Sequence, residues 1–96
     1  MSGAPFYRSL RPFLSWPKLA RPTDWPGVFG RAAPLHIEVG SGNGDWLARE
    51  AAAAPATDFV GIEIEWGRVQ KCLRKIAAGP IGNVRILQMD ARVAMD

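Results

Sequence analysis

The sequence predicts an α/β fold in which parallel strands are joined by crossover helices. Three observations support this prediction. Strand and helix patterns alternate through residues 35–88, a glycine-rich loop follows the first strand, and an acidic residue stands at or just after the end of each later strand. Parallel strands need long connections, usually helices, and ligands bind at the carboxyl ends of such strands. The fold class and the place of a candidate site are therefore predicted together.

The first strand, loop and helix come from one continuous stretch. Leu35–Val39 is a short run bounded by proline and glycine, a pattern typical of a strand. A loop with glycine at alternate positions follows it. Asp45–Ala54 is then predicted to be a helix, because it is rich in alanine, places Leu47 inward and stops before Pro55.

Two more strands and one more helix follow. Phe59–Glu63 predicts the second strand and Val84–Gln88 the third, since both are short and largely apolar. Between them, Trp66–Ala78 is predicted to be a helix. Its apolar residues recur at helical spacing, namely Val69, Leu73 and Ile76. Its basic residues are interpreted as a solvated face rather than an RNA contact: Arg68, Lys71, Arg74 and Lys75.

Residues 1–33 are predicted to be a basic, proline-rich amino-terminal arm, distinct from a partial ligand-binding domain over residues 34–96. Prolines recur through the arm, and each removes a backbone donor and disfavours helix before it. A short helix is expected only where Thr23 or Asp24 can cap it, with Gly30 as its end.

Positive charge is concentrated near the amino terminus. The net charge is +3, and residues 1–37 hold five basic residues against one acid. Such a stretch suits a polyanion such as nucleic acid, although a solvated tail is the favoured interpretation. The aromatic and basic residues there are interpreted as an RNA-stacking surface or, in preference, as an arm that packs on the body or stays disordered. They are Phe6, Tyr7, Arg8, Arg11, Trp16 and Lys18.

Composition argues against several kinds of protein. Cys72 is the only cysteine, so the chain forms no internal disulfide and no Cys-based zinc cluster, as is usual in a reducing compartment. No metal site is predicted, and His36 has no partner ligand in sight. No apolar run approaches the ~20 residues that span a bilayer. We therefore expect a cytoplasmic protein that does not act on or in a membrane.

The glycine loop is the first candidate ligand site. Its glycines, Gly40, Gly42 and Gly44, depart from the dinucleotide pattern, whose third glycine would fall at Asp45. Glu38 and Asp45 flank the loop and would repel a pyrophosphate, offsetting a helix-dipole gain of about 0.3–1 kcal/mol. S-adenosylmethionine carries a sulfonium and an ammonium and no phosphate, so acids beside the loop suit it. The alternatives are a purely structural turn and, for Glu38, a turn-stabilising carboxylate.

Acids at the later strand ends complete the predicted site. Glu63 lies 23 residues after Gly40, close to the spacing at which an acid accepts hydrogen bonds from ribose hydroxyls. Asp90 follows the third strand, where it can accept from an adenine amine. The alternatives are a solvated edge carboxylate for Glu63 and a helix cap for Asp90. Glu65 is a rival to Glu63, but it lies farther from the strand end.

These motifs resemble the tRNA (guanine-N7-)-methyltransferase family over roughly residues 24–92. The matching segments are Asp24-Trp25-Pro26-Gly27-Val28-Phe29-Gly30, Leu35 to Gly44, Phe59 to Glu63, Leu73-Arg74-Lys75 and Gln88-Met89-Asp90-Ala91. The resemblance implies a Rossmann-like S-adenosylmethionine-dependent methyltransferase fold, of which this chain supplies a truncated first half. It also implies that Glu38, Glu63 and Asp90 bind the cofactor.

The resemblance further implies transfer of a methyl group to N7 of guanine 46 in the variable loop of tRNA. The catalytic and tRNA-binding residues are expected downstream of Asp96, so no position is assigned to them. Residues 1–96 alone are then expected to be inactive, with an exposed edge on the first strand. The alternatives are another S-adenosylmethionine-dependent methyltransferase and a non-catalytic nucleoside-binding domain. An NAD-dependent oxidoreductase is disfavoured by Asp45.

The acids around the loop predict a choice between ligands. S-adenosylhomocysteine is expected to bind the full-length protein and NAD is not, because the pyrophosphate of NAD would meet Glu38 and Asp45. Isothermal titration calorimetry with both ligands tests this. Tighter binding of NAD than of S-adenosylhomocysteine would contradict the prediction.

Overall fold

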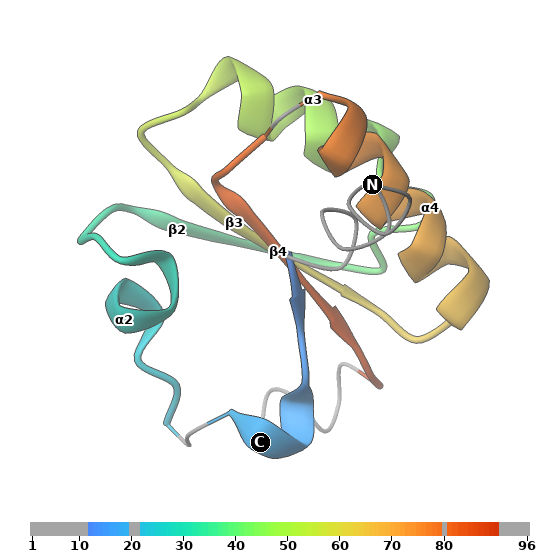
Figure 1. Ribbon diagram of the computed structural model, residues 1–96, viewed down its shortest axis with the longest axis horizontal. Helices are drawn as coiled ribbons and strands as arrows, with labels where there is room; N and C mark the ends of the chain where they lie inside the picture. The colour runs from blue at the N-terminus through green and yellow to red at the C-terminus, as the bar shows by residue number, and fades with distance from the viewer. Residues whose placement is uncertain (1–11, 20–21, 80, 91–96) are drawn as a thin grey trace, which may run out of the picture.

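The computed structural model describes residues 12–19, 22–79 and 81–90. Four strands form one parallel sheet in the order β1-β4-β3-β2 (Figure 1). The strands are β1 (Phe13–Leu14), β2 (Leu35–Val39), β3 (Asp58–Glu63) and β4 (Val84–Gln88). The helical segments are η1 (Trp16–Lys18), α2 (Trp25–Phe29), α3 (Asp45–Ala53) and α4 (Trp66–Ala78). The predicted parallel sheet with crossover helices is therefore confirmed.

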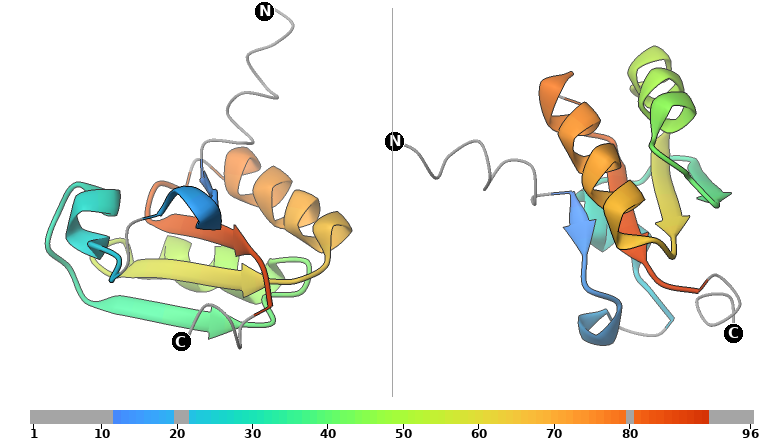
Figure 2. Two further views of the ribbon diagram at one scale, coloured as in Figure 1. Left: turned by 90° about the horizontal axis from the view of Figure 1, so that it is seen from below. Right: turned by 90° about the vertical axis from the view of Figure 1, so that its right-hand side faces the viewer.

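Helices cover both faces of the sheet. In Figure 1, α3 and α4 lie on one side and α2 on the other, and Figure 2 shows the same layers from two further directions. The face under α3 and α4 contributes Phe59, Val84 and Ile86 to one apolar cluster. The opposite face contributes a second cluster, made of Val60, Ile62 and Leu87. Alternation along each strand thus produces two cores.

The predicted elements agree closely with those observed. The bounds predicted for β2, β4 and α4 are those of the structure. Two ends differ by one residue. Helix α3 ends at Ala53, because Ala54 leaves the helical region at φ −130° and ψ 68° just before Pro55. Strand β3 begins at Asp58, because its N–H donates to Pro34 O at 2.8 Å and extends the pairing with β2.

The described part of the segment before β2 packs on the sheet, as the interpretation of an arm that packs on the body expected. Strand β1, which was not predicted, pairs Phe13 with Ile86 of β4. Trp16 packs against the second core from η1. The residues of the proposed RNA-stacking set that precede Pro12 lie outside the described residues, and the domain boundary at residue 33 stays a prediction.

The short helix α2 forms where its capping residues predicted. The Asp24 carboxylate accepts from Gly27 N at 3.2 Å, and Gly30 ends the helix at φ 74°. Just after the helix, Arg31 Nε donates to the buried Asp58 carboxylate at 2.9 Å. This ion pair ties the segment that follows α2 to the start of β3.

Parallel pairing brings the carboxyl ends of β2, β3 and β4 together at the same end of the sheet. The register places Val39 opposite Ile62 and Glu63 opposite Gln88. Strand β2 has no partner on its other side among the described residues, and its Leu35, Ile37 and Val39 are exposed. The open edge that was expected on the Leu35–Val39 strand, now β2, is therefore present in this part of the chain.

Gly61 sits where β3 meets the glycine loop, and Gly61→Ala is expected to destabilise the fold. An added Cβ would lie 2.5 Å from Ser41 Oγ and 2.7 Å from Leu47 Cδ2. Such overpacking typically costs about 1–3 kcal/mol. Urea denaturation measures this loss. Gly82→Ala is the control, because nothing lies within 4 Å of its Cβ position. Equal midpoints for the two variants would show that the loop yields without cost.

Candidate functional site

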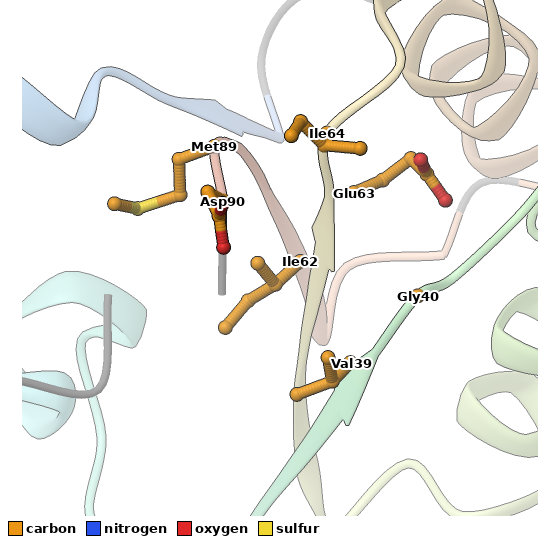
Figure 3. A pocket seen from close by; sticks show the side chains of 7 residues that line it. All are labelled: Val39, Gly40, Ile62, Glu63, Ile64, Met89 and Asp90. Atoms are coloured by element: carbon orange, nitrogen blue, oxygen red, sulfur yellow. The ribbon is translucent and has the colours of Figure 1, made fainter. Parts of the chain in front are cut away.

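A pocket of about 290 Å³ opens at the carboxyl ends of β2, β3 and β4. Its lining residues are Val39, Gly40, Ile62, Glu63, Ile64, Met89 and Asp90 (Figure 3). Three of the six predicted site residues, Gly40, Glu63 and Asp90, therefore line one pocket. Each comes from a different strand end, as the topological rule for parallel sheets requires.

The glycine loop presents bare backbone to open space. Gly40 and Gly42 have φ values of 73° and 58°, and nothing lies within 4 Å of the Cβ position of either. Positive φ strains any residue with a side chain, so glycine is required on conformational grounds. The N–H groups of Gly40 and Ser41 donate to Ile62 O at 2.8 and 3.3 Å. These bonds hold the start of the loop against β3.

Glu63 is a buried carboxylate with defined partners. Only 4% of its surface is exposed. Its Oε1 accepts from Gly42 N at 2.8 Å, and its Oε2 accepts from Glu65 N at 2.9 Å. The interpretation of Glu63 as a solvated edge carboxylate is therefore wrong. Because each carboxylate oxygen has two lone pairs, further acceptor capacity remains for a ligand hydroxyl.

The pocket has two chemically different sides. In Figure 3, the Val39 and Ile62 side chains lie on one side of the strand ends and the Glu63 carboxylate on the other, near Gly40. Met89 and Asp90 lie beyond Ile62, after β4. A ligand that contacts both carboxylates must therefore extend across the ends of the strands, with apolar groups between its polar contacts.

Glu38 lies beside the pocket rather than in its lining. Burial raises the pKa of its carboxyl above the usual range, while Ser41 and His36 act in the opposite direction. Glu65, the rival to Glu63, is exposed and pairs with Arg68 at 3.1 Å, so its carboxylate belongs to the start of α4. Glu63 and Glu65 are therefore separated because β3 ends at Glu63, whereas Glu65 is the N-cap residue of α4.

Asp45, which was predicted to repel a pyrophosphate beside the loop, has a cationic partner. Its carboxylate forms an ion pair with Lys75 of α4, and that hydrogen bond lowers the pKa of Asp45. The charge of Asp45 is thus balanced by a residue 30 positions away, which the sequence pattern did not reveal. Glu38 and Glu63, the other acids near the loop, form no ion pair with a described residue.

Cys72 contacts the site although its sequence pattern indicated only a core residue. Its Sγ donates to Gly42 O at 3.3 Å, and the side chain is fully buried. Burial raises the pKa of the Cys72 thiol to about 11, and the Glu63 carboxylate adds to this effect. The helical spacing of α4 could reveal that Cys72 faces inward, but not that it faces the loop.

Neither a metal-binding cluster nor a membrane-spanning helix is found in the part of the chain that the structure describes, residues 12–19, 22–79 and 81–90. No group of three or more His, Cys, Asp or Glu side chains in this part could hold a metal ion. No helix within it is long and apolar enough to cross a bilayer.

Known proteins share this architecture. A solved structure described as "Structure of an antibiotic related Methyltransferase" superposes with a TM-score of 0.65 at 22% identity, covering 78% of this chain and 39% of that one. The family described as "Putative methyltransferase" matches residues 32–96. The parallel sheet, its glycine loop and these matches define a Rossmann-like methyltransferase fold.

Curated relatives narrow the class. The tRNA (guanine-N(7)-)-methyltransferase of Geobacter metallireducens is 40% identical over 80 residues, which cover 83% of this chain and 38% of the relative. That of Cutibacterium acnes is 41% identical, with 76% and 26% covered. The chain thus spans well under half the length of these relatives. It belongs to the tRNA (guanine-N7-)-methyltransferase family.

The buried thiol predicts slow alkylation. At pH 8, iodoacetamide is expected to modify Cys72 about a hundredfold more slowly in the folded protein than in denaturant, because the thiolate is the nucleophile and a raised pKa depletes it. Mass spectrometry of timed samples measures both rates. Similar rates in the two states would show that the thiol is open to solvent.

Proposed function

We propose that this chain forms the S-adenosylmethionine-binding part of a tRNA (guanine-N7)-methyltransferase. The observation that supports this most directly is Glu63, a buried carboxylate at the end of β3 that touches the glycine loop and shares a pocket with Asp90. The names of the curated relatives support the reaction and the substrate.

The residues present fit this cofactor. S-adenosylmethionine is cationic at its sulfur and its amino group, and the carboxylates of Glu38 and Glu63 lie near the loop. Its adenine presents flat aromatic faces, and Ile62, Ile64 and Met89 supply an apolar lining for them. Open space beside Gly40 and Gly42 allows the backbone to approach a ligand closely.

Each predicted site residue then has a role. Glu63 accepts hydrogen bonds from the two ribose hydroxyls with the lone pairs that its backbone partners leave free. Asp90 accepts from the adenine amine. Glu38 contributes negative charge beside the methionine end of the ligand. Gly40, Gly42 and Gly44 shape the loop, and Gly44 must lack a side chain because a Cβ there would lie 2.8 Å from Cys72 Sγ.

Methyl transfer to guanine N7 asks little proton chemistry of the protein. The bound cofactor supplies an electrophilic methyl group, and N7 is a nucleophile with a free lone pair. The contribution of this chain is to hold the cofactor rigidly, so that catalysis depends on alignment with the incoming base. No described residue is assigned to proton transfer.

The remaining parts of the proposal concern the substrate and the place of action. We propose guanine 46 of the tRNA variable loop as the target and the cytoplasm as the compartment. The groups that position the nucleobase lie beyond Asp96 in this proposal. The shorter span of the chain relative to its curated relatives is consistent with that assignment.

The ribose role of Glu63 predicts a large effect of Glu63→Ala on ligand binding. Two hydrogen bonds to a charged group are lost, each worth about 1.5–3 kcal/mol, so the affinity for S-adenosylhomocysteine should fall at least tenfold. Calorimetry on the folded full-length protein measures it. Glu65→Ala is the matched control, because Glu65 carries the same charge two residues away but is exposed. An equal, small effect of both variants would remove Glu63 from the site.

Residues 1–96 alone are expected to transfer no methyl group to tRNA, because positioning of the base requires a surface that this proposal places elsewhere. Incorporation of radiolabelled methyl groups into unmodified tRNA tests this. The full-length Geobacter metallireducens relative, at equal concentration, serves as the positive control. Turnover by residues 1–96 would show that substrate binding resides in this part of the protein.

A further inference from the structure

The peptide groups on either side of Gly42 are held from two directions. The Gly42 N–H donates to Glu63 Oε1 at 2.8 Å, and the Gly42 carbonyl accepts from Cys72 Sγ at 3.3 Å. Glu63 ends β3, and Cys72 lies in the second turn of α4. Two elements distant in sequence therefore meet at one residue of the glycine loop.

We propose that Cys72 is a positioning residue, which together with Glu63 fixes Gly42 in the conformation that the glycine loop presents to the cofactor. The proposal rests on the proposed function, since it assigns a role in cofactor binding. It differs from that function in concerning a residue that cannot itself touch a ligand, because Cys72 is fully buried.

Gly42 needs such support because glycine is the least restrained residue. Its φ of 58° is one of many conformations open to it, and fixing one of them has an entropic cost. Neighbouring loop bonds act on other groups, such as Gly44 N to Ser41 O at 3.1 Å. The contacts to Glu63 and Cys72 are thus the described side-chain contacts that act on Gly42 itself.

Position 72 has room only for a small side chain, and the side chain there donates to the loop. A Cβ added to Gly44 would lie 2.8 Å from Cys72 Sγ and 3.0 Å from Cys72 Cα, so α4 packs directly on the loop. Alanine at position 72 fits that space but cannot donate, and serine fits and donates. The two substitutions therefore separate packing from hydrogen bonding.

Glu63 contacts the glycine loop and, in the proposed function, also the ligand. Glu63→Ala removes an acceptor for the ligand and a partner of Gly42 at the same time, so its effect on affinity contains both contributions. Variants of Cys72 leave Glu63 in place and change the support of the loop and the packing of the core around it. They measure the positioning contribution without altering any group that the ligand contacts.

The test compares Cys72→Ala and Cys72→Ser in the full-length protein. The readouts are hydrogen exchange of the Gly42 amide, the dissociation constant of S-adenosylhomocysteine, and KM for S-adenosylmethionine beside kcat. Cys72→Ala should accelerate Gly42 exchange and weaken binding by about threefold to tenfold, the range of one modest hydrogen bond. KM should rise more than kcat falls. Cys72→Ser should restore most of each change.

Ile76→Val is the control for stability. Ile76 is buried in α4 one turn beyond Cys72 and belongs to the same core, so shortening it lowers stability without removing a contact to Gly42. It should lower the melting temperature and leave Gly42 exchange and ligand affinity unchanged. Should Cys72→Ala lower only the melting temperature, as Ile76→Val does, the thiol is a packing residue and the proposal is wrong.

Two further outcomes are decisive. Cys72→Ser that matches Cys72→Ala in exchange and affinity, at equal melting temperature, would overturn the role of the hydrogen bond. Accelerated Gly42 exchange in Cys72→Ala, combined with no binding of S-adenosylhomocysteine by the unchanged protein, would support the contact to the loop. The absence of binding would overturn the role of Cys72 in cofactor binding, and the proposed function with it.

Discussion

Burial of β3 is the constraint on which the rest of the structure depends. All six residues of this strand are buried, and it pairs on both edges, with β2 and with β4. Phe59 faces the core under α3 and α4, while Val60 and Ile62 face the opposite core. A strand so enclosed has one possible register, since a shift by one residue would exchange its two faces. The position of its last residue, Glu63, is fixed accordingly.

Glu63, held at that position, orders the backbone around the pocket. A buried carboxylate needs partners, and its partners here are backbone N–H groups of the glycine loop and of the turn before α4. The same contacts that satisfy the charge therefore order the backbone around the pocket. The fold and the candidate site share their interactions, so a change at Glu63 affects both.

The acidic residues around the loop have different partners, so they do not contribute equally to its charge. Asp45 is balanced by Lys75, and Glu65 by Arg68, whereas Glu63 is satisfied by backbone dipoles. Neither Glu63 nor the half-buried Glu38 forms an ion pair with a described residue, so both contribute negative charge at the glycine loop. A cationic ligand is consistent with this distribution of charge, because opposite charges attract at short range.

The sequence by itself determined the alternation of strands and helices, the glycine loop, and the placement of Gly40, Glu63 and Asp90 at one sheet edge. These follow from local periodicity and from a topological rule, which need no knowledge of side-chain contacts. Only the tertiary structure decided the pairing of β1 with β4, the Asp45–Lys75 ion pair and the contact of Cys72 with Gly42. Each joins residues 30 or more positions apart, and no local pattern encodes such a meeting because it depends on how the packed layers align.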